Sequence, residues 1–141
     1  MDTPSTDRNL FQRLLGLCAT RPPADRGAWT FDGNRIVIDL NRAPELAAPH
    51  GAIRLEKDGL PERVLVVHAQ SGYHAFRNRC THAGRRLDPV PGHDCVQCCS
   101  IGKSTFNWEG QVLSGSAKSP VVTFPTTAED HTVTITLHVA M

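Results

Sequence analysis

The chain has 141 residues, a length typical of one domain, and 40% of them are hydrophobic, enough to build a core that needs no metal or disulfide to fold. Its formal net charge of +1 provides neither the broad basic surface of a nucleic-acid-binding protein nor an acidic tail. No apolar run approaches the roughly 18 residues that a membrane span requires, so neither nucleic acid nor a membrane is expected as a partner.

Residues 1–27 are expected to form a short helix and a linker. Apolar residues recur at helical spacing over residues 7–18, namely Leu10, Phe11, Leu14, Leu15 and Leu17. Asp7 is a candidate N-cap, and Arg21-Pro22-Pro23 ends the helix. Such a helix either packs on the rest of the domain or docks a larger partner.

The same segment does not resemble a secretory signal. Its start is acidic, and Arg13 interrupts the apolar residues. The bulky Leu17 before Cys18 also disfavours lipid attachment. We therefore expect a cytoplasmic protein, in which clustered thiols are more often metal ligands or redox groups than structural disulfides.

Residues 28–141 form a second unit that is rich in short β patterns. The expected strands are 29–31, 35–40, 52–56, 63–69, 73–76, one short strand within the stretch 80–107, 104–107, 112–115, 120–124 and 132–139. Residues 41–50 are expected to form a proline-rich loop, and residues 126–131 a polar turn. Short strands without intervening helices predict an all-β fold, an antiparallel β-sandwich or a small barrel.

A cluster of cysteine and histidine lies in the stretch 80–107, which holds four of the five cysteines. Cys80-Thr-His82 places two kinds of ligand in one tight loop, and Cys95-Val-Gln-Cys98-Cys99 supplies up to three thiolates. Thiolate and imidazole together suit zinc or iron–sulfur centres and not magnesium or calcium. The pattern therefore predicts a metal centre between two loops.

Residues 52–137 resemble a Rieske domain, and small Rieske-type ferredoxins most of all. That family has a first box Cys-x-His and, about sixteen residues later, a second box Cys-x-x-His-Gly-Ser-x-Phe-Asp. The corresponding residues here are Cys80-Thr-His82 and Cys99-Ser-Ile-Gly102-Lys103-Ser104-Thr105-Phe106-Asn107. The resemblance implies a Rieske-like sandwich with two cluster-binding loops and a [2Fe-2S] cluster. It also implies that the chain is not an enzyme but a one-electron carrier, which serves a reductase, an oxygenase or another redox enzyme.

The second box departs from the family at Gly102, which occupies the slot of the second histidine and has no side chain to bind iron. The excess of cysteine beside this vacancy favours the ligand set Cys80, His82, Cys98 and Cys99. Cys95 is the leading substitute for the fourth ligand, and His93 lies further out. Because neighbouring side chains on an extended strand point to opposite faces, Cys98 and Cys99 can share one cluster only if the backbone turns between them.

Replacing one imidazole by a thiolate lowers the expected reduction potential. It should fall between the roughly −150 to +300 mV of Rieske centres and the roughly −400 mV of all-cysteine plant-type clusters. Two other functions stay open: a cluster-free or zinc-binding interaction module, and a thiol redox sensor. Four arginines around the first box, Arg77, Arg79, Arg85 and Arg86, either guide an acidic partner or form a solvated loop.

Overall fold

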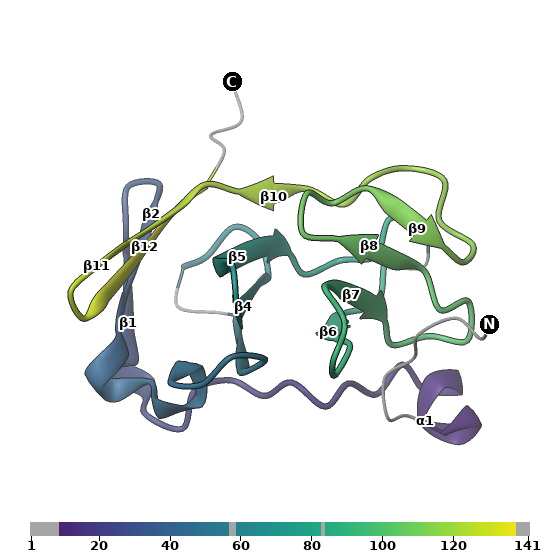
Figure 1. The fold of residues 1–141 in the computed structure, drawn as a ribbon, viewed down its shortest axis with the longest axis horizontal. Helices are drawn as coiled ribbons and strands as arrows, with labels where there is room; N and C mark the ends of the chain where they lie inside the picture. Colours follow the sequence, from purple (N-terminus) through teal and green to yellow (C-terminus); the bar gives the residue numbers. More distant parts are fainter. Residues whose placement is uncertain (1–8, 57–58, 83, 138–141) are drawn as a thin grey trace.

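Three four-stranded antiparallel sheets make up the computed structural model, which describes residues 9–56, 59–82 and 84–137 (Figure 1). Sheet A has the strand order β1 (Trp29–Asp32), β2 (Arg35–Asp39), β12 (Thr132–Thr136), β11 (Thr126–Glu129). Sheet B has the order β10 (Thr123–Phe124), β5 (Gly72–Arg77), β4 (Val64–Ala69), β3 (Ala52–Leu55). Sheet C has the order β6 (Leu87–Pro89), β7 (Cys95–Cys98), β8 (Thr105–Asn107), β9 (Val112–Ser114). The helical elements are α1 (Leu10–Leu14) and the 3-10 turns η1 (Arg26–Ala28), η2 (Leu40–Arg42) and η3 (Pro44–Leu46).

Sheet B is the middle layer, because its strand β4 is apolar on both faces. Val64 and Val66 point into one core, which includes Ile36, Ile38, Val133 and Ile135 of sheet A. Leu65 and Val67 point into a second core with Leu87, Val96 and Phe106 of sheet C, and this second core also contains Cys80 and Cys98. Cys80 of the first box and Cys98, which precedes the second box, therefore reach one buried layer between sheets B and C.

The predicted all-β, antiparallel class is confirmed. The hairpin expected at residues 29–40 is β1 and β2, which pair from Trp29 with Ile38 to Asp32 with Arg35. Two local predictions were wrong. Residues 126–129, expected within a turn, form β11 against β12, and the stretch 80–107 contains β6 and β7 before β8. Backbone pairing with a neighbouring strand gives the polar sequence of β11 its structure, which hydrophobic periodicity does not reveal.

The N-terminal helix packs in an unexpected orientation. Its N-cap is Asn9, which forms a capping box with Gln12, while the candidate cap Asp7 lies outside the described residues. Arg13 is the buried side chain, with only 3% of its surface exposed. The apolar side chains of Leu10, Phe11 and Leu14 are 71%, 67% and 60% exposed. The buried side chain of the helix is thus a polar one, and the apolar side chains face outwards.

After α1 the chain runs along one long edge of the molecule, from sheet C to the first strand of sheet A (Figure 1). Within this segment, Arg21 O accepts a hydrogen bond from Arg54 N of β3 at 3.0 Å. Within the described ranges, no helix combines the length and apolar character that crossing a bilayer would need.

Candidate metal centre

Two tight loops at one end of sheet C carry the two predicted boxes. The first box follows β5, and here Gly84 N donates to Cys80 O at 2.9 Å and Cys80 N donates to Arg85 O at 2.7 Å. Residues 99–104 connect β7 to β8, and Cys98 N donates to Ser104 O across the base of this loop at 2.7 Å. Each loop thus has a fixed backbone from which to present ligands.

The structure brings Cys80 and Cys98 together. Both are essentially fully buried in the second core, at 1% and 0% exposure, and their side chains form a hydrogen bond. Cys98 Sγ also lies 3.1 Å from Ser100 Oγ. The hydrogen bond with Cys80 and then burial raise the pKa of Cys98 far above that of a free thiol. A metal bound here would have to displace the proton of Cys98, as thiolate ligation requires.

His82 and Gly102 also face each other across the two loops. The His82 side chain is exposed, and a methyl group placed on Gly102 would lie 3.6 Å from His82 Nδ1. The same methyl group would lie 2.9 Å from Ser116 Oγ. The slot of the missing second histidine therefore borders the imidazole of the first box, and a serine hydroxyl borders the same space.

Cys99 is held elsewhere. It forms a disulfide with Cys18 of the N-terminal segment, across a sequence separation of 81 residues and with the two Cα atoms 5.5 Å apart. Cys98 points into the core and Cys99 towards the N-terminal segment, as the alternation of an extended strand requires. The four residues expected as one ligand set are therefore not gathered in one place. The expectation that clustered thiols are metal ligands or redox groups rather than structural disulfides therefore does not describe Cys99 in this structure.

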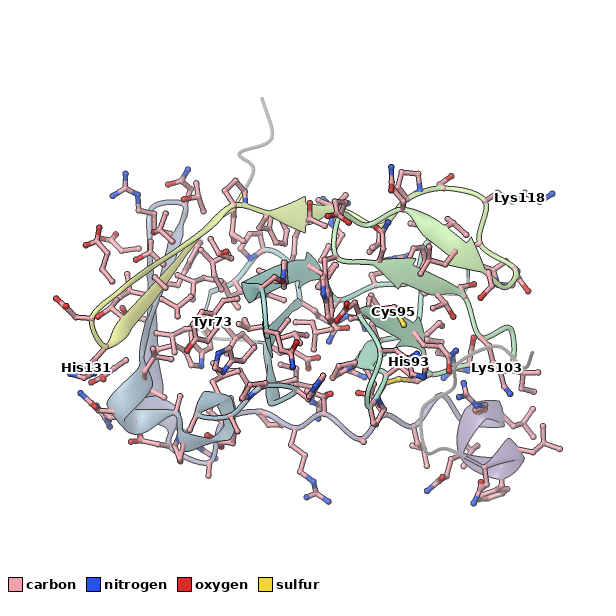
Figure 2. All side chains as sticks on the ribbon, viewed as in Figure 1. Tyr73, His93, Cys95, Lys103, Lys118 and His131 are labelled. Atoms are coloured by element: carbon pink, nitrogen blue, oxygen red, sulfur yellow. A yellow bond between two sulfur atoms is a disulfide. The ribbon has the colours of Figure 1, made fainter. Side chains whose placement is uncertain are left out.

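The two substitute ligands lie away from the Cys80–Cys98 pair. Cys95 is buried three positions before Cys98 on β7, a spacing that turns it to the other face of a strand, and it is not part of the second core. His93 is exposed in the turn between β6 and β7, at the far end of this hairpin from Cys98. Figure 2 labels both residues, near sheet C.

The arginines around the first box divide into two pairs. Arg77 forms an ion pair with Glu62, and Arg86 forms one with Glu56. Arg79 and Arg85 are exposed, and Arg85 Nη1 donates to the carbonyl of Leu15 at 2.9 Å. Two of the four cations are therefore neutralised locally, whereas Arg79 and Arg85 present exposed positive charge.

Three residues near the loops were missed by the sequence reasoning. Cys18 and the carboxylate of Asp88 lie with Cys99 in one group whose ligand atoms are all within 4.8 Å of one another. Ser116 borders the slot at Gly102. Cys18 is 62 residues before Cys80, so spacing gives no sign of its position. The sequence signal for it was weak: Cys18 is the fifth cysteine of the chain and the one outside the stretch 80–107, so a disulfide with a cysteine of that stretch could have been considered.

Three solved structures with the same fold are a ferredoxin, a Rieske protein and a putative reductase subunit. The ferredoxin of carbazole 1,9a-dioxygenase from Nocardioides aromaticivorans IC177 is 18% identical with a TM-score of 0.59, covering 72% of this chain and 95% of that one. The cyanobacterial plasma-membrane Rieske protein PetC3 from Synechocystis PCC 6803 is 23% identical with a TM-score of 0.51, covering 60% and 85%. A putative small subunit of nitrite reductase is 21% identical with a TM-score of 0.52, covering 70% and 93%. At these identities the likeness establishes the fold.

No curated protein matches the chain closely enough to count as a relative. The family model of the Rieske [2Fe-2S] domain matches residues 39–125, which is more than half of the chain and includes both loops. Together with the fold and the convergence of Cys80, Cys98 and His82 on the two loops, this match gives the family: the chain belongs to the Rieske [2Fe-2S] domain family.

Proposed function

We propose that the chain is a one-electron carrier of the Rieske type, a redox component rather than a catalytic enzyme. The observation that carries this proposal is the meeting of the two loops: Cys80 with Cys98 in the core, and His82 with the slot at Gly102 near the surface. When bound, a [2Fe-2S] cluster supplies reversible uptake of one electron.

The donor set fits such a cluster on three of its four positions. Cys80 and Cys98 would hold one iron from the buried side, and His82 would hold the other from the exposed side. The fourth position falls at Gly102, where the hydroxyl of Ser116 is a neighbouring oxygen donor. Cys99, expected as the cysteine ligand of the second box, would have to leave its disulfide and change its orientation before it could bind iron. We therefore centre the proposal on Cys80, Cys98 and His82.

Burial of the two cysteines and exposure of His82 indicate the side of the site through which electrons would enter and leave. The sulfur side of the site lies under the core of sheets B and C, while the imidazole side reaches the surface. A partner redox protein would approach the His82 side, where Arg79 and Arg85 are exposed and favour an acidic surface. One solved relative in fold is a complex between the reduced oxygenase and oxidised ferredoxin of carbazole 1,9a-dioxygenase, with a TM-score of 0.56. An oxygenase or a reductase is therefore the partner class we propose.

Anaerobic purification followed by iron and acid-labile sulfide analysis tests the proposal directly. We expect two irons and two sulfides per chain and a reduced-state EPR signal. Cys80→Ser and Cys98→Ser should each remove the iron, because each takes away a buried thiolate. Cys95→Ser is the matched control, a buried cysteine on the other face of β7, and should keep the cluster. A colourless zinc protein, or iron lost equally from all three variants, would contradict the proposal.

A thiol redox sensor is the second candidate, and the Cys18–Cys99 disulfide favours it. It predicts a metal-free protein whose folded state persists without iron and whose disulfide opens and closes with the ambient redox potential. The same iron analysis separates the two candidates.

A further inference from the structure

The N-terminal segment is held against sheet C by contacts at several points. Arg13 Nη2 donates to Gln97 Oε1 at 2.8 Å, and Arg13 Nη1 donates to the carbonyls of Cys98 (3.2 Å) and Ser100 (3.3 Å). Further along, the backbone N–H groups of Ala19 and Thr20 donate to the two oxygens of Asp88, at 2.7 and 2.9 Å. The Cys18–Cys99 disulfide lies between these anchors, so it can open without releasing the segment.

The two sulfurs of this disulfide have different surroundings. Cys99 is fully buried and lies next to the carboxylate of Asp88, whereas Cys18 is only partly buried. An attacking thiolate must approach along the axis of the S–S bond from outside and therefore reaches Cys18.

A cationic pocket opens beside Cys18. It has a volume of about 800 Å³, within the roughly 300–1,000 Å³ of small-molecule sites, and its lining includes Cys18, Trp29, Arg21, Arg26, Arg54 and Glu56. Glu56 is bound by Arg86 through two hydrogen bonds of 2.5 and 3.0 Å, so its charge is compensated. Arg54 also pairs with Glu56, at 3.4 Å. Among the described residues, neither Arg21 nor Arg26 forms an ion pair. The lining thus offers the positive charge of Arg21 and Arg26 to an anionic ligand.

We infer that this pocket binds a low-molecular-weight thiol that carries carboxylates, and that the bound thiol opens the disulfide at Cys18. The thiolate of the ligand attacks Cys18 Sγ and forms a mixed disulfide with it. The Cys18–Cys99 bond breaks, and Cys99 leaves as a thiolate that takes one proton from solvent. No outside oxidant is needed, because the disulfide bond is exchanged and not created. The reverse attack by Cys99 restores the starting state, and the anchors at Arg13 and Asp88 keep Cys99 within reach.

Glutathione is the probe, because it is an acidic tripeptide thiol of suitable size, and its diethyl ester is the control because it carries the same thiol without the carboxylates. The full-length protein as purified is mixed with each thiol, quenched with acid at early times, and mapped by mass spectrometry of its peptides. We expect one adduct per chain, on Cys18, that forms several-fold faster with glutathione than with the ester after correction for thiolate fraction. Raising the salt concentration should shrink this difference.

Arg21→Gln and Arg26→Gln should slow the reaction of glutathione and leave that of the ester unchanged. Arg35→Gln is the matched control, an exposed arginine on β2 outside the pocket lining, and should slow neither. The inference is overturned if the adduct appears mainly on Cys99, if no adduct forms, if the two thiols react alike, or if the Arg35 variant slows as much as the others. The same mapping on Cys80→Ser separates this inference from the proposed function, because the Cys18 adduct should form there whether or not iron is bound.

Discussion

Gly102 determines what kind of centre the two loops can hold. Its backbone is not in the left-handed region, so a side chain is allowed there, and the obstacle is Ser116 Oγ at 2.9 Å from the position of a Cβ atom. Ser116 is the end of a flexible side chain on an exposed loop, so it can be removed without disturbing a strand. The backbone at residue 102 therefore does not exclude a side chain, and a ligand could be introduced there by substitution.

The double variant Gly102→His/Ser116→Ala should restore a second imidazole beside His82. We expect its reduction potential to rise into the range of roughly −150 to +300 mV, because centres in which two imidazoles bind one iron have potentials in that range. Spectroelectrochemical titration with EPR measures the change. Gly102→Ala/Ser116→Ala is the control that fills the same space without a ligand, and equal potentials in the two variants would refute the prediction.

Lys103 adopts a backbone conformation that usually belongs to glycine. Its φ angle is 51°, in the left-handed region, and glycine is the residue that the Rieske motif carries at this position. Lys103→Gly should raise the free energy of unfolding by about 1 kcal/mol, since the steric cost of a Cβ atom in this region disappears. Urea denaturation checks it, with Lys118→Gly, in an exposed loop and without a positive φ, as the control. An unchanged midpoint in the Lys103 variant would contradict this account.

At the scale of elements, β-strands were easier to infer than the helix. Alternating apolar residues report burial of one face, and β1, β2 and β12 follow that rule, whereas β4 is a continuous apolar run buried on both faces. The positions of all four strands could therefore be predicted from the sequence. The helix Leu10–Leu14 breaks the corresponding rule, because a guanidinium bound to carbonyls replaces its apolar side chains as the buried group. Hydrophobic periodicity shows where apolar residues recur, but it does not show that the polar face of a helix will be the buried one.

The same limit applies to the site. Cys80, His82 and Cys98 come together through two loops whose spacing the family motif fixes, so sequence could suggest them. The disulfide partner of Cys99 lies 81 residues away on a segment whose path depends on tertiary contacts with Gln97 and Asp88. No local pattern encodes such a contact, and the separate faces of Cys98 and Cys99 follow only once β7 is known to extend to Cys98.

Arg13 is the residue on which the docking of α1 depends most. Arg13→Met keeps much of the side-chain length and removes the donors to Gln97 and to the carbonyls of Cys98 and Ser100. We expect a loss of about 3 kcal/mol in the free energy of unfolding, because buried acceptors lose charged hydrogen-bond donors. Amide exchange should also speed up across residues 9–17. Arg35→Met, at an exposed position of β2, is the control. If Arg13→Met lowers the free energy of unfolding no more than Arg35→Met does, contacts other than those of Arg13 hold the helix.

The molecule as a whole combines a Rieske domain with a covalent tie, the Cys18–Cys99 disulfide, which joins the N-terminal segment to the second loop. Disulfides are typical of oxidising compartments and uncommon in the cytosol. The cytoplasmic location expected from the N-terminal sequence is therefore consistent with this tie only if the bond opens and closes in the cell. Thiol exchange at Cys18 would provide that reversibility, with Arg13 and Asp88 holding the segment in place while the bond is open.

The contribution of the tie to global stability can be measured on the intact chain. A disulfide that closes a loop of this length should stabilise the fold by about 4 kcal/mol, mainly by restricting the unfolded chain. Cys18→Ser/Cys99→Ser should therefore unfold at lower urea concentration than the wild type without reductant, and the wild type with reductant should match the variant. Cys95→Ser, which removes a buried thiol and leaves the tie intact, corrects for the effect of the substitution itself. If wild type and double variant unfold at the same urea concentration once iron content is equal, then the noncovalent anchors alone set the stability of the segment, because the disulfide adds nothing to it.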